Sequence, residues 1–183
     1  MGKFVIVSGS PAEFSRSAAI AKFVGELLEE NNEVEFIHVK DLPPEDLVYA
    51  KWDSEAIKKS IRLIESADAL VVISPVYKAS YTGLLKTFID LLPEKSLVNK
   101  TILPILNGGT VAHLLSLEYA FKPVFSVLGA TDIVNGVYLV DSQVQYRETE
   151  ITFIENEAEQ RLRNNVSELI SRVNNQPTLV IKG

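Results

Sequence analysis

A buried strand, a small polar loop and a helix follow one another near the start of the chain, and this unit restricts the fold more than any other feature. Residues 4–7 are apolar and mostly β-branched, which predicts a strand buried on both faces. Residues 8–11 (Ser-Gly-Ser-Pro) end the strand, and apolar residues at helical spacing follow from Ile20 to Leu28. Strands buried on both faces belong to parallel sheets that helices cover. We therefore expect an α/β fold.

The same alternation continues along the whole chain. We predict further strands at residues 33–39, 69–73, 101–106 and 131–140, and further helices at 54–65, 83–92, 110–128 and 153–173. Residues 41–53 contain two prolines and are predicted to form a surface excursion. Strands that alternate with helices through short connections indicate βαβ units with right-handed crossovers. Five strands favour a doubly wound parallel sheet with helices on both faces and a ligand at the carboxyl ends of its strands.

Length and composition limit the possibilities. The 183 residues (1–183) suggest one domain, and the sequence leaves open whether residues 178–181 of the tail (176–183) form an edge strand or are disordered. No apolar run approaches the roughly 20 residues that span a bilayer. A net charge of −6 argues against nucleic acid or an anionic membrane as a partner. The absence of cysteine excludes disulfides and thiolate metal sites, no metal is expected, and the cytoplasm is the expected compartment.

The first loop has the composition of a phosphate site. It joins a strand to a helix N-terminus, whose free N–H groups and positive dipole end attract anions. The hydroxyls of Ser10, Ser15 and Ser17 and the guanidinium of Arg16 add donors. Neither the P-loop pattern nor the G-x-G-x-x-G dinucleotide pattern is present, so a phosphate monoester on a smaller ligand fits better. The alternative is an ordinary strand-to-helix turn with a serine N-cap.

The loops that follow the first, third and fourth strands emerge on one side of a parallel sheet. In the second of these loops, Pro75 and Tyr77 offer an apolar wall for a planar ring. Gly108, Gly109 and Thr110 offer N–H donors to the edge of such a ring. A phosphate beside a flat heteroaromatic ring describes flavin mononucleotide (FMN). Taken singly, a tyrosine such as Tyr77 is more often packed in the core, and a glycine pair is more often a plain turn.

Several motifs carry a resemblance to a known family. They are Gly9-Ser10-Pro11 with Ser15-Arg16-Ser17, residues 74–78 (SPVYK) continuing to 81–86 (YTGLLK), residues 90–94 (DLLPE), residues 108–115 (GGTVAHLL) and residues 141–144 (DSQV). The chain resembles the NADPH-dependent FMN reductases of the flavodoxin-like fold, most of all the reductases of two-component alkanesulfonate monooxygenase systems. This resemblance implies the strand order 2-1-3-4-5. It also implies reduction of FMN by NADPH, delivery of reduced FMN to a partner monooxygenase, and homodimers that pair into homotetramers. NADH remains open as the donor.

The chemistry implied is hydride transfer from nicotinamide to flavin, so we expect no acid–base or nucleophilic side chain. The predicted cofactor-binding residues are Ser10, Ser15, Arg16, Ser17, Pro75, Val76, Tyr77, Lys78, Gly108, Gly109, Thr110 and His113. Arg16 is expected to neutralise the FMN phosphate, with a solvated surface arginine as the alternative. Lys78 is assigned either to the NADPH phosphates or to solvent, and His113 either to the flavin ring or to a capping or interface position. His38 is expected to be structural.

Pro123 falls inside the predicted helix 110–128, where it leaves the Tyr119 carbonyl without its α-helical donor. The compensation is either a π-bulge, with the Val124 N–H bonded to the Tyr119 carbonyl, or a plain kink. The resemblance favours the π-helix, because the two-component FMN reductases are similar in having a tyrosine inserted there at the tetramer interface. We therefore expect Tyr119 to lie near the flavin site and to assist release of FMN.

Two other functions remain open at this level. A quinone or azo-dye reductase would retain FMN as a prosthetic group. A flavodoxin-type electron carrier would show a T-x-T-G-x-T phosphate loop, which the sequence lacks.

Overall fold

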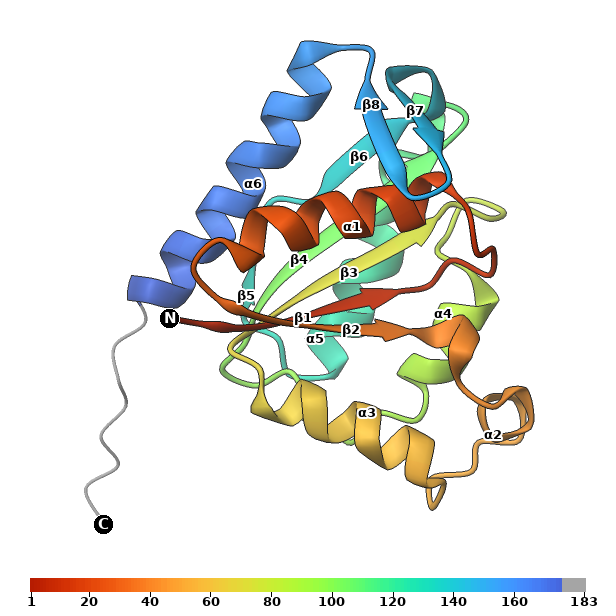
Figure 1. The fold of residues 1–183 in the computed structure, drawn as a ribbon. Coiled ribbons are helices and arrows are strands. Elements are labelled where there is room, and N and C mark those ends of the chain that lie inside the picture. Colours follow the sequence, from red (N-terminus) through yellow and green to blue (C-terminus); the bar gives the residue numbers. More distant parts are fainter. Residues whose placement is uncertain (176–183) are drawn as a thin grey trace.

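The computed structural model describes residues 1–175. The prediction for residues 178–181 lies outside this range. A parallel sheet forms the centre, with the strand order β2 (Glu33–His38), β1 (Lys3–Ser8), β3 (Ala69–Pro75), β4 (Thr101–Gly108) and β5 (Asp132–Ile133). The expected order 2-1-3-4-5 is thus confirmed (Figure 1).

The fifth position of the sheet is divided, although the sequence predicts one strand over residues 131–140. β5 pairs with the start of β4, and a separate strand β6 (Val137–Val140) pairs with its end. Between the two paired stretches, Leu103 and Pro104 of β4 stand opposite residues 134–136, so the edge carries an extra residue there. Pro104 has no N–H to donate, and an interruption beside a strand proline is expected.

Helices cover both faces of the sheet. On one face, side chains of α1 (Arg16–Glu29) and α6 (Asn156–Asn175) share an apolar cluster with the strand residues Phe4, Ile6 and Val71. On the other face, the cluster contains side chains of α3 (Glu55–Ser66), α4 (Gly83–Ile89) and α5 (Lys122–Val127). Among residues 1–175, no helix combines the length and the apolar character needed to cross a membrane.

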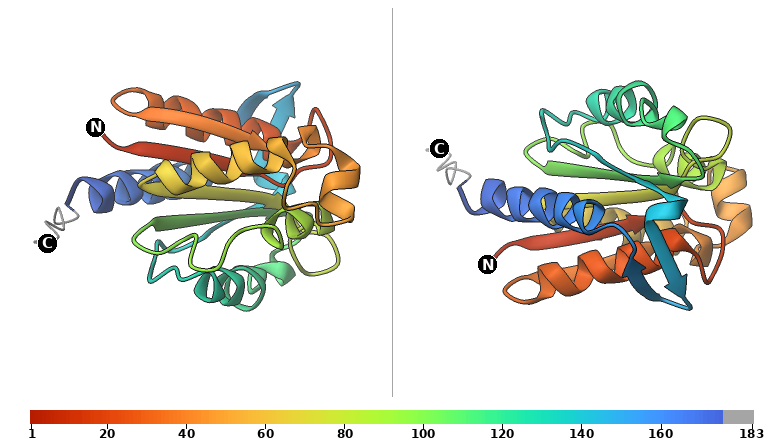
Figure 2. Two further views of the ribbon diagram at one scale, coloured as in Figure 1. Left: turned by 90° about the horizontal axis from the view of Figure 1, so that it is seen from below. Right: turned by 90° about the horizontal axis from the view of Figure 1, so that it is seen from above.

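Two segments differ from the prediction. A short helix, α2 (Pro44–Val48), lies in the surface excursion, and the Ser54 hydroxyl bonds the Asp46 carboxylate at 2.6 Å instead of capping α3. The expected helix 153–173 begins only at Asn156. It is preceded by an antiparallel hairpin of β7 (Val144–Arg147) and β8 (Glu150–Phe153), which the sequence analysis missed. Both views of Figure 2 show this hairpin beside the N-terminal end of α1.

The segment 110–128 is not the single long helix that we predicted. It contains a 3₁₀ turn (Val111–His113), a π-helix (Leu117–Phe121) and then α5. The Lys122 N–H donates to the Leu117 carbonyl, five residues back, which is the bond that defines a π-helix. A π-helix is therefore present in place of a plain kink, but its i→i+5 bond joins Lys122 to Leu117 and is not the bond from Val124 to Tyr119 that we predicted. Pro123 is the second residue of α5, which continues directly from the π-helix.

Candidate functional site

The loops that follow β1, β3 and β4 emerge on the right-hand side of Figure 1 and are joined by hydrogen bonds. The Thr82 hydroxyl donates to the Gly9 carbonyl at 2.7 Å, which connects the β3–α4 loop to the β1–α1 loop. The Val76 N–H donates to the Asn107 carbonyl at 2.8 Å and so connects β4 to the same group. These bonds fix the three loops relative to one another before any ligand arrives.

The first loop ends in a helix N-terminus suited to an anion. The Ser15 hydroxyl caps α1 by accepting the Ala18 N–H at 3.1 Å, and it lies 2.9 Å from the Ser10 hydroxyl. The first turn of α1 carries no acidic side chain, and the N–H groups of Arg16 and Ser17 have no intrahelical acceptor. The Ser17 hydroxyl is buried and donates to Asn107 Oδ1 at 2.5 Å, so this side chain fastens the loop to β4. Only its backbone N–H remains for a ligand.

Arg16 lies against the segment that joins β6 to the hairpin. Its Nη1 is 3.5 Å from Asp141 Oδ2, its Nε donates to the Val144 carbonyl at 3.3 Å, and it lies over the Tyr146 ring. The other carboxylate oxygen, Asp141 Oδ1, is buried and has no hydrogen-bond partner among residues 1–175. Buried polar atoms are nearly always satisfied. A ligand that carries both a phosphate and hydroxyl groups would satisfy this oxygen as well as the guanidinium.

The second loop projects an aromatic ring from a strained turn. Tyr77 and Ser80 exchange backbone hydrogen bonds of 2.8 and 3.2 Å around Lys78 and Ala79, whose φ angles are +51° and +64°. Two consecutive left-handed residues form the turn of a tight hairpin, which normally takes glycine or asparagine. The Tyr77 side chain is 52% exposed and is free to lie against a planar ring. Pro75 ends β3 at the base of this turn.

The third loop presents glycines whose environments differ. The buried Tyr138 hydroxyl donates to the Thr110 carbonyl at 2.8 Å, and burial raises the pKa of Tyr138, so the phenol stays protonated as a donor. A Cβ at Gly108 would lie 2.6 Å from that hydroxyl oxygen, so internal packing requires this glycine. A Cβ at Gly109 would meet no atom within 4 Å. Gly109 therefore opens toward the space where the edge of a flavin ring is expected.

This contrast predicts different outcomes for two neighbouring substitutions. Gly109→Ala is expected to raise the dissociation constant of FMN about tenfold, because the new methyl group occupies ligand space, with the free energy of unfolding unchanged. Gly108→Ala is expected to lower that free energy by about 1–3 kcal/mol through overpacking against Tyr138. Flavin fluorescence titration and urea unfolding of both variants measure the two effects. A Gly109→Ala variant with parental FMN affinity would contradict the placement of the ring edge.

His113 and Tyr119 line a shared pocket of about 230 Å³ with Ala79 and Ser116. Tyr119 is 79% exposed, and His113 is half-buried at the end of the 3₁₀ turn. The pocket adjoins the Tyr77–Ser80 turn because the Ser116 hydroxyl donates to the Ala79 carbonyl at 2.9 Å. Tyr119 therefore lies beside the Tyr77–Ser80 turn, which we call the ring-binding turn because it is predicted to hold the flavin ring. The roles of His113 and Lys78 toward a ligand stay predictions.

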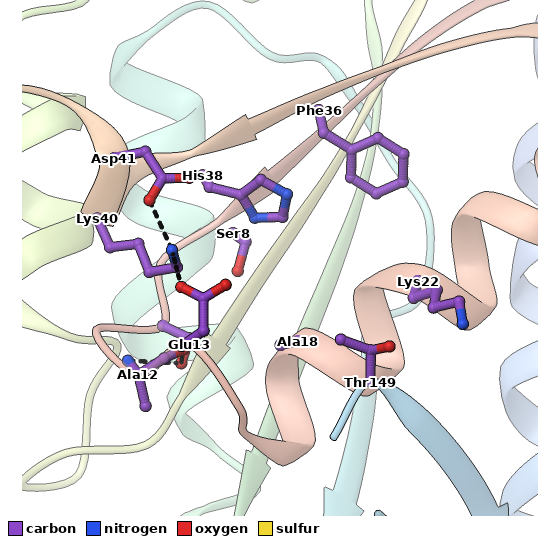
Figure 3. Close-up of a pocket in the computed structure, with 11 residues that line it drawn as sticks. Ser8, Ala12, Glu13, Ala18, Lys22, Phe36, His38, Lys40, Asp41 and Thr149 are labelled. Atoms are coloured by element: carbon purple, nitrogen blue, oxygen red, sulfur yellow. Dashed lines mark hydrogen bonds and ion pairs between the residues drawn. The ribbon is translucent and has the colours of Figure 1, made fainter. Parts of the chain in front are cut away.

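A second pocket, of about 290 Å³, lies on the β2 side of the first loop (Figure 3). Lys40 at its rim bonds Glu13 and Asp41, each at 2.6 Å, and these bonds raise its pKa. The contact with Glu13 ties the first loop to the end of β2. His38, which lines this pocket, stacks on Phe36 with ring centroids 5.7 Å apart, and its structural role stays a prediction. Lys22, the other lysine of this pocket, is paired with Glu150.

Sequence reasoning gave no individual role to four residues that shape the site, although two of them lie in the motifs quoted above: Thr82, Asn107, Tyr138 and Asp141. Thr82 had a detectable signal, because it precedes a helix at a position typical of an N-cap, and it does accept the Leu85 N–H. The contacts of the other three are made with residues distant in the sequence, which no local pattern reveals.

Comparison with known proteins identifies the family. A family model described as NADPH-dependent FMN reductase matches residues 2–145. The chain belongs to this family. An FMN reductase (NADPH) of Escherichia coli K12 is 46% identical over 144 residues, which cover 78% of this chain and 75% of that protein. The NADH-dependent FMN reductase SfnE of Pseudomonas putida is 33% identical, with 76% and 77% of the two chains covered.

Among solved structures, the apo form of an NADH:FMN oxidoreductase (EMOB) matches the FMN reductase fold of this chain with a TM-score of 0.86. It is 32% identical and covers 97% of this chain and 92% of its own. The predicted resemblance, oxidoreductase class and cofactor pair of FMN and NADPH are therefore confirmed at the level of the family. The open helix N-terminus, the orphaned Asp141 oxygen and the space over Gly109 fit FMN.

Proposed function

We propose that this protein catalyses the reduction of FMN by NAD(P)H in the cytoplasm and releases the reduced flavin to a partner monooxygenase of alkanesulfonate utilisation. The observation that carries the release step is the π-helix, which places the exposed Tyr119 beside the predicted ring-binding turn. The alkanesulfonate assignment rests on the resemblance carried by residues 108–115 and by Tyr119, the tyrosine that follows them.

Bound FMN would supply the chemistry, by accepting a hydride from the nicotinamide. The N–H groups at the start of α1, with the hydroxyls of Ser10 and Ser15, hold the phosphate. Tyr77 and Pro75 form the wall on one side of the ring, and the N–H groups near Gly109 and Thr110 stabilise negative charge at its edge. Tyr138 orients this last loop through its bond to the Thr110 carbonyl.

An anaerobic filtration experiment tests the release step. The protein is mixed with an excess of NADPH and FMN under nitrogen and passed through a membrane that retains protein. The proposal predicts reduced FMN in the filtrate at many times the protein concentration. With NADH in place of NADPH, reduced FMN should also reach the filtrate, although the rate of its formation can differ. Reduced flavin confined to the retained protein, in a one-to-one ratio, would instead show a reductase that keeps FMN as a prosthetic group.

We further propose that the chain assembles into homodimers that pair into homotetramers. α4 ends at Ile89, not at residue 92 as predicted, and most of its apolar side chains are buried within the chain, so the helix itself leaves little apolar surface for a partner. An apolar groove of about 410 Å³ nevertheless lies between α4 and α5. It includes Val127, which is 83% exposed.

A charge in this groove is expected to weaken assembly. Val127→Asp would bury a carboxylate at an apolar interface, which costs several kcal/mol, so its sedimentation at micromolar concentration should shift toward the 20.3 kDa monomer. Val48→Asp, at an exposed valine on α2, serves as the matched control and should sediment like the parent. A parent protein that sediments only as a monomer would refute the assembly.

A further inference from the structure

Two side-chain contacts connect the Tyr77–Ser80 turn and the residue after it to the π-helix. The first is the bond from the Ser116 hydroxyl to the Ala79 carbonyl, 2.9 Å long. The second is a stack of the Tyr81 ring on Phe121, with centroids 5.0 Å apart and planes 7° from parallel. Ser116 and Phe121 are both buried, so the two contacts are internal to the chain. Phe121 in turn stacks on Phe125 of α5, which anchors it to the core.

Ser116 and Phe121, the two anchors, are spaced in the sequence so that a helical turn wider than an α-helical one is needed between them. In an α-helix each residue advances about 100°, so side chains five positions apart point about 140° away from each other. Ser116 and Phe121 are five positions apart, and both contact the same short segment, 79–81. The π-helix between them, with its i→i+5 bond from Lys122 to Leu117, brings both to the same side.

We propose that Ser116 and Phe121 are positioning residues that clamp the ring-binding turn to the π-helix. Because both anchors are fixed, the helix cannot rotate to accommodate the one residue more than the four-residue spacing of an α-helix. The helix bulges instead, and Tyr119 points outward, 79% exposed, beside the Tyr77–Ser80 turn. The clamp also acts on the turn itself. Lys78 and Ala79 adopt unfavourable left-handed conformations. The Ser116 hydroxyl, which lies outside the turn, stabilises this arrangement by donating to the Ala79 carbonyl.

Hydrogen exchange of the ligand-free protein tests the clamp without reference to activity. Ser116→Ala removes one hydrogen bond, and the Tyr77 and Ser80 amides are expected to exchange roughly five times faster. Ser116→Thr retains the hydroxyl and should restore slow exchange. Ser126→Ala, an exposed serine on α5, is the matched control and should match the parent. Equal exchange at these amides in the parent and in Ser116→Ala would overturn the proposal.

The second anchor provides an independent test if Ser116→Ala does not fold. Tyr81→Leu removes the stack on Phe121 and should also accelerate exchange at Tyr77 and Ser80. Tyr81→Phe keeps the ring and should not. Equal exchange in these two variants would contradict a clamp that depends on ring stacking.

The consequence for FMN rests on the proposed function. If the parent reduces FMN, Ser116→Ala should raise KM for FMN roughly fivefold and leave kcat within twofold, since a loosened turn must be ordered when the ring binds. A parent that does not reduce FMN would refute the proposed function and leave the exchange result to decide the clamp. If the parent reduces FMN and Ser116→Ala has the same KM for FMN, the link between the clamp and flavin binding is overturned.

Discussion

Deletion of Tyr119 is expected to produce a protein that stays yellow through dialysis and turns over free FMN at least about tenfold more slowly, which corresponds to a rise of roughly 1.4 kcal/mol or more in the barrier to turnover. Without this residue, Ser116 and Phe121 are four positions apart, a spacing that a regular α-helix already places on one face. Both anchors of the Tyr77–Ser80 turn are then kept, while the π-helical turn between them becomes an ordinary α-helical turn. The flavin site remains, but the exposed ring beside it is lost.

Two control variants distinguish the effect of losing the Tyr119 ring from the effect of losing the π-helical turn. Tyr119→Ala keeps the inserted residue, so it should preserve the π-helix and show only the effect of losing the ring. Tyr49→Ala removes a ring of similar exposure, 73%, that lies in the surface excursion, and should behave as the parent. A deletion variant that purifies colourless and reduces free FMN like the parent would show that Tyr119 has no part in flavin release.

Arg16→Ala is expected to raise the dissociation constant of FMN about ten- to hundredfold, corresponding to about 1.5–3 kcal/mol for a charge-assisted bond. Riboflavin lacks the phosphate, so its affinity should change little, and the ratio of the two constants isolates the phosphate contact. Arg62→Ala, at an exposed arginine on α3, is the matched control. An unchanged FMN constant in Arg16→Ala would remove Arg16 from the phosphate site.

The ion pair between Arg16 and Asp141 refines this expectation. Asp141 competes with a phosphate for the guanidinium, which it holds beside the segment that joins β6 to the hairpin. Both side chains are about one-third exposed, so their pairing energy is modest. The larger part of the loss in Arg16→Ala should therefore come from the missing phosphate contact, which the comparison with riboflavin measures.

Much of the fold could be predicted because its signals are local. The buried strands are continuous apolar runs, the crossover rule makes them parallel, and their order was expected from the resemblance. The β7–β8 hairpin was missed because its turn lacks the usual glycine or asparagine: Glu148 takes the left-handed conformation, with φ of +55°. Pro123 predicted an irregular helix, since the proline removes one specific donor, and the resemblance then favoured a π-helix over a plain kink.

The internal connections of the site could not be predicted, because they depend on packing between distant segments. Ser17 appears in the sequence as a third phosphate ligand, but its hydroxyl bonds Asn107, 90 positions away. Arg16 meets Asp141 only because the hairpin that follows Asp141 lies beside α1. Composition showed which loops hold small and polar residues. Only the folded structure shows which of these groups bond one another and which, like Gly109, face open space.

The most direct test of the proposed function is the rate of NADPH oxidation by extensively dialysed protein, measured with and without added FMN. We predict a colourless protein, a negligible rate without flavin, and a rate that rises with free FMN and saturates. The same saturation should be absent in Arg16→Ala over the range that saturates the parent. A dialysed protein that remains yellow and oxidises NADPH equally well without added FMN, passing electrons to a quinone or an azo dye, would contradict the account.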